Sequence, residues 1–442
     1  MRYRSLALVA ALVLILGCGG RPASAQVSLG GEAAYRFGAQ IPIGSPSDTL
    51  LSHVGSATAS LYAASDVGEI ELIGAVEQDF MAGSTDLSLE ESELVAYLGS
   101  YLVLRTGVFD YQPSVSDLLP SFNFFARRDL ESYFEGRVGE ATLPAPLVQL
   151  TGLAGPYFGR VTIMPTEAKV PFVDPDSPWF PNLGFPEEIR IGFPSPTVMR
   201  LTEIVVEPYP DPSRSFTDVS YQAEFGGTVR AFDFRLLYYH GQDLRPRYTA
   251  TLEFPEGLFQ DYRVRLTPIE WNLDAFGASL LAVLGPVRTY GEILHRHTDA
   301  VVIERVTSTP SGFQTIIHES PTYTYTLGAS YRSSFPAVLL TAEYTNSGIL
   351  KPVTRMIEPN LEHAAAASAT WSPLDGRLSL TAFGLVSLRD YSFNTSFRGE
   401  VWSRDASLGL RLTVPAFWGE PDTELGQFSD LLFPSVTLTY RF

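Results

Sequence analysis

The chain has a single cysteine, only two lysines and no long uncharged apolar segment beyond its first residues. One cysteine excludes an internal disulfide, a cysteine-based structural zinc site and an ordinary iron–sulfur centre. Acidic residues outnumber basic ones by 49 to 31, so the chain lacks the clustered positive charge that holds nucleic acid. No internal apolar run approaches the roughly 18–20 residues of a membrane helix.

The first 25 residues have the pattern of an export signal. Arg2 and Arg4 precede an apolar stretch at 5–17, and an Ala-Ser-Ala site ends at Ala25. This order predicts Sec export and cleavage after Ala25. The alternative uses Cys18, which follows Ile-Leu-Gly in a sequence that resembles a lipoprotein box and would then be acylated. On either reading the protein leaves the cytoplasm, and we expect residues 26–442 to form one domain.

The remaining chain alternates apolar and polar residues. In 433–442, one face carries Val436, Leu438, Tyr440 and Phe442, and the other carries Ser435, Thr437, Thr439 and Arg441. A period of two places each set on its own side of a β-strand. Similar alternation recurs at 232–238, 322–331, 378–389 and 408–414.

Strand length separates a membrane barrel from a soluble sandwich. Many alternating runs reach about 9–12 residues, which suits a tilted membrane strand, whereas soluble strands centre near 5–6. Tyr and Phe stand towards the ends of the apolar faces, as interfacial girdles require. Because unpaired backbone groups are costly in hydrocarbon, such strands need a closed sheet. We therefore predict an all-β protein, a transmembrane antiparallel up-and-down β-barrel.

Short turns alternate with longer connections along the chain, and the longest connections are about 110–144 and 165–216. This rhythm is typical of membrane barrels. Eight turns join sixteen strands in pairs, and a first strand at 28–37 and a last at 433–442 bring the prediction to about 18. The stretch 246–270 is either a protruding hairpin or part of the wall, which sets the range at 16–20. The turns are expected at 65–68, 99–101, 155–156, 226–228, 285–286, 333–336, 372–376 and 403–406.

If the apolar set faces lipid, the other set faces the lumen, and it contains many charges. A water-filled interior can hold charges that a packed core could not. Carboxylates predominate early in the chain and arginines late, which suggests a transverse field across the pore; the alternative is a hydrated wall with cross-strand ion pairs. The predicted lumen charges are Glu69, Glu71, Glu91, Glu93, Arg105, Glu224, Arg235, Glu292, Glu343, Arg377, Arg389 and Arg411.

Two long loops could narrow the passage. The first carries Phe122, Phe124, Phe125, Arg127 and Arg128, which could line a constriction for an anionic or sugar-like solute by stacking and bidentate hydrogen bonds. The alternative is a loop folded over the rim with its aromatic side chains packed on the barrel wall. The second loop, rich in proline, is interpreted as a lid or plug at the outer mouth.

The sequence offers no recognisable catalytic machinery. It contains no Gly-x-Ser-x-Gly, Walker or His-Glu-x-x-His motif. His295 and His297 share one face of a strand but have no nearby third ligand, so we interpret them as residues at an exposed strand end. We therefore predict no catalytic residue, no metal, no cofactor and no enzymatic activity.

With its export signal, alternating strands, short turns and terminal Val-Thr-Leu-Thr-Tyr-Arg-Phe, the chain resembles a Gram-negative outer-membrane β-barrel of the porin-like type. The resemblance implies that the barrel-assembly machinery reads Tyr440 and Phe442, together with Leu438, as an assembly signal. It also implies outer-membrane lipid as the surroundings of the barrel.

We predict a porin-like channel through which small hydrophilic solutes pass down their gradient, with selectivity set by pore width and charge. The excess of carboxylates favours cations, although carboxylates in loops far from the pore could account for it. The alternative is a plugged barrel that serves surface display, adhesion or envelope architecture. Neither the oligomeric state nor the solute can be inferred from the sequence.

Overall fold

The computed structural model describes residues 26–42, 50–65, 67–81, 83–125, 127–128, 142–165, 188–191, 197–207, 219–245, 248–254, 261–306, 313–333, 337–352, 361–421, 423, 425–429 and 431–442. The expected export signal and its cleavage or acylation site lie outside these residues. No helix in the described ranges is long and apolar enough to cross a membrane.

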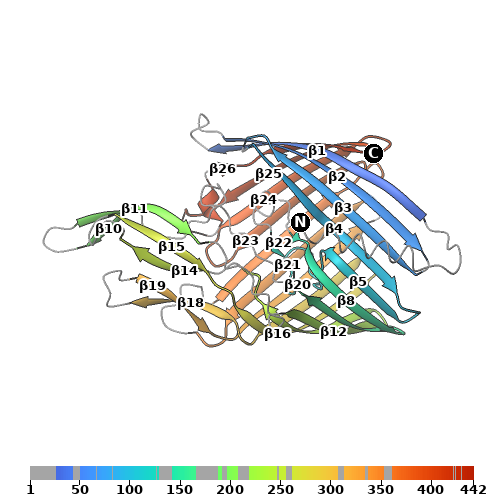
Figure 1. Ribbon diagram of the computed structural model, residues 1–442, viewed down its shortest axis with the longest axis horizontal. Helices are drawn as coiled ribbons and strands as arrows, with labels where there is room; N and C mark the ends of the chain where they lie inside the picture. Colours follow the sequence, from blue (N-terminus) through green and yellow to red (C-terminus); the bar gives the residue numbers. More distant parts are fainter. Residues whose placement is uncertain are drawn as a thin grey trace.

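Antiparallel strands form one large sheet that curves round on itself (Figure 1). In the described part of the chain it has eighteen strands, the last of them interrupted, which confirms the predicted barrel of about 18. They are β1 (Gln26–Pro42), β2 (Leu50–Ser65), β3 (Gly68–Asp79), β4 (Ser84–Tyr97), β5 (Leu102–Phe109), β8 (Ala145–Ala154), β9 (Tyr157–Met164), β12 (Ser220–Val229), β13 (Phe232–Gln242), β16 (Asn272–Leu284), β17 (Val287–Arg296), β20 (Thr322–Ser333), β21 (Val338–Ile349), β22 (Leu361–Trp371), β23 (Leu378–Ser387), β24 (Phe393–Trp402), β25 (Leu408–Trp418) and the interrupted strand β26 (Leu431–Leu432) with β27 (Ser435–Arg441).

The sheet closes because β1 pairs with β2 on one side and with β27 on the other. Tyr35 stands opposite Leu438, and Gly31 and Phe442 exchange two backbone hydrogen bonds of 3.0 and 3.1 Å. A closed sheet leaves no row of unpaired N–H and C=O groups, which is the condition for strands in hydrocarbon.

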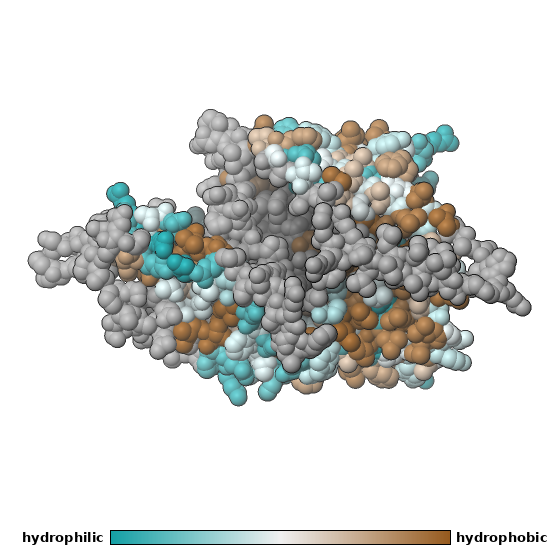
Figure 2. Space-filling model, viewed as in Figure 1, coloured by the Kyte–Doolittle hydropathy of each residue, from teal (hydrophilic) through white to brown (hydrophobic). Residues whose placement is uncertain are grey.

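The two faces of the wall differ in the way that the alternation predicts. Outward side chains are apolar and exposed: Leu236, Leu438 and Tyr440 have exposed fractions of 53%, 48% and 52%. Inward side chains are largely polar, and Gln222 and Thr326 are fully buried inside the barrel. Figure 2 shows hydrophobic side chains spread over the wall. The outward face thus presents the apolar surface that a bilayer requires.

Short turns gather at one end of the barrel, and one predicted turn is displaced. The turn between β12 and β13 lies at 230–231, where Arg230 has a φ of +57°, and not at 226–228. Gly226 lies inside β12. A glycine is needed at this position because a Cβ there would lie 2.7 Å from the ring of Phe158. The glycine pair therefore marks a close contact with a neighbouring strand and no chain reversal.

Six further strands form a second sheet that projects from the long-loop end of the barrel (Figure 1). The hairpin from the stretch 246–270 belongs to it, so this stretch protrudes and is not part of the wall. The described parts of the loop at 165–216 contribute β10 and β11; the lid or plug expected from the rest of that loop lies outside the described residues. In spatial order the sheet contains β10 (Glu188–Ile191), β11 (Thr197–Val206), β15 (Tyr262–Pro268), β14 (Tyr248–Glu253), β19 (Phe313–Glu319) and β18 (Ala300–Val306).

Candidate functional site: the inserted loop and the lumen wall

The segment Asp110–Phe125 leaves β5 at the long-loop end of the barrel and folds into the lumen; we call it the inserted loop. Its polar groups meet inward-facing side chains of distant strands. The hydroxyl of Ser121 lies 2.8 Å from that of Thr326 on β20. Further contacts reach Glu292 on β17 and Glu343 on β21. The loop therefore runs along the inner wall and narrows the passage from within.

The aromatic residues of this loop are buried, which corrects one expectation. Phe122 and Phe125 are 0% and 1% exposed, and Phe124 stacks on Tyr239 of the wall with ring centroids 4.3 Å apart. Gly277 of β16 leaves the space for Phe122, because a Cβ there would lie 2.8 Å from its ring. These rings therefore do not line a slot for solute, because burying them against apolar wall positions removes more apolar surface from water. They fit the alternative in which the aromatic side chains of the loop pack on the barrel wall.

The two arginines predicted beside these rings lie outside that cluster. Arg127 and Arg128 form the short strand β6, which pairs with β7 (Thr142–Leu143). Their side chains are outside the described residues, so the constriction role expected of them stays a prediction.

Glu292 fastens the first half of the inserted loop. Its carboxylate accepts hydrogen bonds from the hydroxyl of Ser114, at 2.7 and 2.8 Å, and from the backbone N–H groups of Val115 and Ser121. The residue is only 3% exposed. A buried carboxylate is tolerated when such donors satisfy its oxygens, and each charge-assisted bond contributes roughly 1.5–3 kcal/mol.

Glu343 fastens the next turn of the loop in the same way. The backbone N–H groups of Asp117, Leu118 and Leu119 donate to its carboxylate at 2.7, 3.0 and 2.6 Å. The hydroxyls of Ser116 and Tyr290 donate as well. Three successive amides on one carboxylate fix the backbone of this turn, so its position depends on a single wall residue.

Arginines of the wall also hold the loop. Arg288 of β17 donates to Asp117 at 2.8 Å and to the carbonyl of Val115 at 2.7 Å. Arg235 of β13 donates to the carbonyl of Pro113 and lies 3.5 Å from Glu224. Wall carboxylates thus bind the amides of the loop, while wall arginines bind two of its carbonyls and the carboxylate of Asp117.

Several predicted lumen charges form ion pairs and hydrogen bonds along the inner wall. Glu93 of β4 pairs with Arg105 of β5. Arg411 of β25 lies 3.6 Å from Glu400 of the neighbouring strand. Glu69 accepts from the hydroxyls of two tyrosines on β2 and β4, at 3.1 and 2.6 Å. These contacts agree with the alternative of a hydrated wall with cross-strand pairs.

The other predicted lumen charges have mixed outcomes. Glu71 stands opposite Glu93 in the register of β3 and β4. Arg377 lies in the β22–β23 turn, and Arg389 lies in the connection beyond the other end of β23, 3.8 Å from Glu362. Neither arginine is on the lumen wall, because β23 is shorter than the alternation suggested. The side chain of Glu91 is outside the described residues.

Closure of the barrel also corrects the expected transverse field. Because β1 pairs with β27, the first and last strands are neighbours. On the closed sheet, three strands (β27, β1 and β2) separate Arg411 on β25 from the early carboxylates on β3. These charges therefore lie on the same part of the wall and do not face each other across the lumen.

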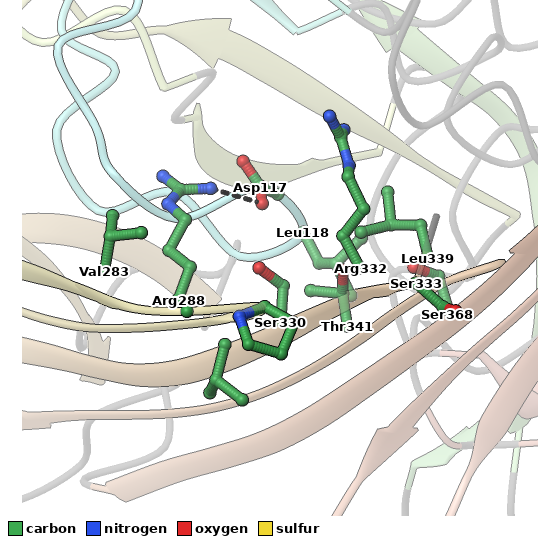
Figure 3. Close-up of a pocket in the computed structure, with 13 residues that line it drawn as sticks. Asp117, Leu118, Val283, Arg288, Ser330, Arg332, Ser333, Leu339, Thr341 and Ser368 are labelled. Atoms are coloured by element: carbon green, nitrogen blue, oxygen red, sulfur yellow. Dashed lines mark hydrogen bonds and ion pairs between the residues drawn. The ribbon is translucent and has the colours of Figure 1, made fainter. Parts of the chain in front are cut away.

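A cavity of about 810 Å³ remains between the inserted loop and the wall, near the short-turn end (Figure 3). Arg288 and Arg332 reach from the wall on either side of Asp117 in this view. Hydroxyls line the floor, and Leu118 and Leu339 contribute apolar surface. The loop therefore narrows the lumen without filling it at this level.

Several residues that hold the inserted loop against the wall were not predicted from the sequence. Ser114, Asp117, Arg288 and Arg332 were not selected, although the segment 113–121 is rich in Ser and Pro. Such a segment has many amides that no helix or sheet satisfies, and these must find acceptors when they are buried. The sequence signal for a wall residue that accepts such amides is a single Glu between Thr residues on an inward face, as at 341–345.

His295 and His297 have neighbouring rings, with centroids 6.1 Å apart. Within the described ranges, no group of three or more His, Cys, Asp or Glu side chains could hold a metal ion.

A closed antiparallel barrel with an apolar exterior, a charged interior and a loop fastened inside the lumen is the architecture of a transmembrane β-barrel. No protein-family model matches the chain, and no curated protein sequence matches it.

Solved structures, in contrast, are similar along almost the whole chain. OccK8 (OprE) of Pseudomonas aeruginosa matches with a TM-score of 0.52 at 8% identity, over 94% of this chain and 98% of that one. OpdO of the same organism has a TM-score of 0.52 at 10% identity, over 94% and 97%. OccAB1 of Acinetobacter baumannii has a TM-score of 0.51 at 8% identity, over 95% and 96%. At this identity the likeness shows the fold: the chain is a barrel of the outer-membrane porin type.

Proposed function

We propose that the protein is a passive outer-membrane channel for small hydrophilic solutes. One observation carries the proposal: the inserted loop is fastened to the wall by Glu292 and Glu343 and leaves an open cavity beside it. A loop held in this way sets the width of a passage, and the charged inner wall keeps that passage wet. Movement down a gradient needs no catalytic residue and no cofactor.

The membrane placement rests on the outward face of the barrel. Its apolar side chains suit lipid, and the predicted export signal would bring the chain to the envelope. Tyr440 and Phe442 stand on the outward face of the last strand, 52% and 69% exposed, where an assembly machinery could read them. These positions support the proposed assembly signal.

Planar bilayers test the channel directly. Purified protein inserted into a bilayer in potassium chloride should give stepwise increases in conductance. Complete silence at all voltages, from protein shown to be folded by its compact migration on unheated SDS gels, would contradict the proposal. Ion selectivity from the reversal potential in a salt gradient would then test the expected preference for cations.

The projecting sheet favours a second candidate function, surface display or adhesion. It carries a small core of its own around Tyr262 and Val264, both fully buried, and stands clear of the barrel wall. Deleting its β14–β15 hairpin separates the two functions. A channel should keep its conductance, whereas a display protein should be silent before the deletion and lose partner binding after it.

A further inference from the structure

The outward face of the barrel wall carries few ionisable side chains besides tyrosine, and these gather at one end. Among the described side chains on this face there is no Arg, Lys or Glu and a single Asp, Asp274. Each of its histidines lies within three residues of the long-loop end of β2, β13, β17 or β22. In membrane barrels that end faces the cell exterior, so these imidazoles stand at the level of the outer lipid headgroups. They are His53, His240, His295, His297 and His363, five of the six histidines in the chain.

Three of these histidines lie on neighbouring strands; we call His240, His295 and His297 the histidine patch. The Nδ1 atom of His240 lies 2.8 Å from the carboxylate of Asp274, its direct neighbour on β16. The rings of His295 and His297 have centroids 6.1 Å apart, and the backbone N–H of His297 donates to the carbonyl of Asp274 at 2.7 Å. The patch therefore places three imidazoles beside one carboxylate, where the connections to β14 and β18 leave the barrel (Figure 1).

The charge of the histidine patch depends on pH. Beyond the strand ends, Asp243 and Asp299 share Arg245, which leaves one further negative charge near the patch. Imidazole gains a positive charge between about pH 8 and pH 5, so acidification changes this region from negative to positive. The other titratable or charged groups that face the patch, from its own and the neighbouring strands, are Asp274, Tyr221, Tyr238 and Tyr323.

The imidazoles of the patch have hydrogen-bonding capacity that the described part of the chain does not use. There, His295 and His297 have no hydrogen-bond partner, and His240 uses only its Nδ1 atom. An ionisable side chain at membrane level is costly to keep, so one that persists without a protein partner marks a functional surface. An imidazolium presents N–H donors, and its bond to an anionic oxygen is roughly twice as strong as a neutral hydrogen bond.

We propose that the histidine patch is a proton-dependent binding surface for the anionic phosphate of an outer-leaflet lipid headgroup. Ile293 and Phe276, outward neighbours of His295, are 57% and 54% exposed and suit acyl chains. A phosphate above acyl chains is the arrangement of a phospholipid, so the polar patch and the apolar wall beside it fit one molecule. The inference goes beyond the proposed channel and requires no conductance.

Quenching by brominated lipids tests this surface in the reconstituted full-length protein. Ile293→Cys in a Cys18→Ser background places a single cysteine beside the patch, because Cys18 is the one cysteine of the chain. A fluorophore on that cysteine reports which brominated lipid lies next to it. The affinity for phosphatidylglycerol relative to phosphatidylcholine should rise about fivefold or more from pH 8 to pH 5.5, the effect of one added charge near an anionic lipid. An equal ratio at the two pH values would overturn the proposal.

Matched variants assign the effect to the patch. His295→Gln combined with His297→Gln should remove most of the rise at the Ile293→Cys reporter. His53→Gln changes a histidine of the same face on β2, far from β17 along the closed sheet, and should leave the rise unchanged. A reporter at Val414→Cys, on the outward face of β25, should show little rise. A wild-type rise in the double variant, shown to be folded by its compact migration on unheated SDS gels, would refute the assignment.

Inorganic phosphate distinguishes a lipid from a free anion. Added in excess over phosphatidylglycerol at pH 5.5, it should leave the quenching preference unchanged, because acyl chains hold a lipid phosphate at the level of the patch. Loss of the preference would assign the patch to soluble anions and overturn the lipid proposal. The channel proposal is tested by conductance and the patch by quenching, so each can fail while the other stands.

Discussion

The guanidinium of Arg441 lies 2.9 Å from the carboxylate of Glu32, across the seam where the last strand meets the first. The same guanidinium covers the ring of Trp402 at 3.9 Å from its centroid. Beside this pair, a Cβ on Gly31 would lie 2.5 Å from the ring of Phe442. The Arg441–Glu32 ion pair, the contact of Arg441 with Trp402 and the close approach of Phe442 to Gly31 all lie at this seam. The seam is therefore specified by side chains as well as by backbone pairing.

Gly31→Val should impair closure of the barrel. The new side chain would meet the ring of Phe442 and, at 2.8 Å, the carbonyl of Thr58, and backbone cannot give way cheaply. The folded fraction, measured by compact migration on unheated SDS gels, should fall. Gly74→Val is the matched control, because nothing lies within 4 Å of its Cβ position. Equal folding of the two variants would refute this role of Gly31.

Glu343→Ala should loosen the inserted loop. Three backbone amides would lose their acceptor, and each buried N–H left unpaired costs roughly 1–3 kcal/mol. Single-channel records should show higher and noisier conductance. Glu362→Ala removes an exposed carboxylate with two long contacts, to Arg389 at 3.8 Å and to the hydroxyl of Ser347 at 3.5 Å, and should leave the records unchanged. Quiet, wild-type currents in Glu343→Ala would show that the loop is held by other contacts.

Phe122→Ala should destabilise the packing of the loop on the wall. Removing a fully buried ring costs about 3–5 kcal/mol through lost contacts and a residual cavity. The free energy of unfolding in denaturant should fall by that order. Phe225→Ala removes a ring of the outward face that is 49% exposed, and its cost should be clearly smaller. Similar losses for both variants would contradict the burial argument.

The projecting sheet should weaken in acid. Hydrogen bonds from Arg265 lower the pKa of both Glu207 and Glu253 below the ordinary value. A carboxylate with a lowered pKa in the folded sheet stabilises it above the unfolded pKa, near 4.5, and the stabilisation is lost as pH falls through the lowered value. The protection factors of the β14 and β15 amides, which correct for the intrinsic pH dependence of exchange, should therefore fall below pH 4.5.

Arg265→Gln is the test of that acid effect. Without the arginine the two carboxylates lose the partner that lowers their pKa, so the acid-induced loss of protection should shrink. Arg200→Gln changes an exposed arginine of β11, 3.4 Å from Glu188, and should leave that loss of protection unchanged. An unchanged pH profile in Arg265→Gln would assign the acid response to other groups.

Alternation and turn spacing were sufficient to predict the barrel and its strand number, because both are local properties of the chain. The turn at 226–228 was placed wrongly because a glycine that admits a ring from the next strand looks like a turn glycine in sequence. Arg377 and Arg389 were assigned to the wall because alternation continues past the residues that pair. Local pattern thus predicts which face a residue takes more reliably than where its strand ends.

The course of the inserted loop could not be predicted from the sequence. Its position depends on Glu292 and Glu343, which stand more than 170 residues from the amides that they bind. On their strands they look like other inward carboxylates. The rings of Phe122 and Phe125 gave no sign of whether wall or solute would cover them, since apolar wall positions from several strands meet only in the folded barrel.

Arg441 and Glu32 are separated by 409 positions. Synthesis of the chain from β1 through β27 must therefore be finished before β1 can acquire its second neighbour. A chain released early by the ribosome would lack that partner and would present β1 as an open edge, the kind of surface that invites aggregation and proteolysis. Completion of the seam thus depends on strands from the two ends of the barrel.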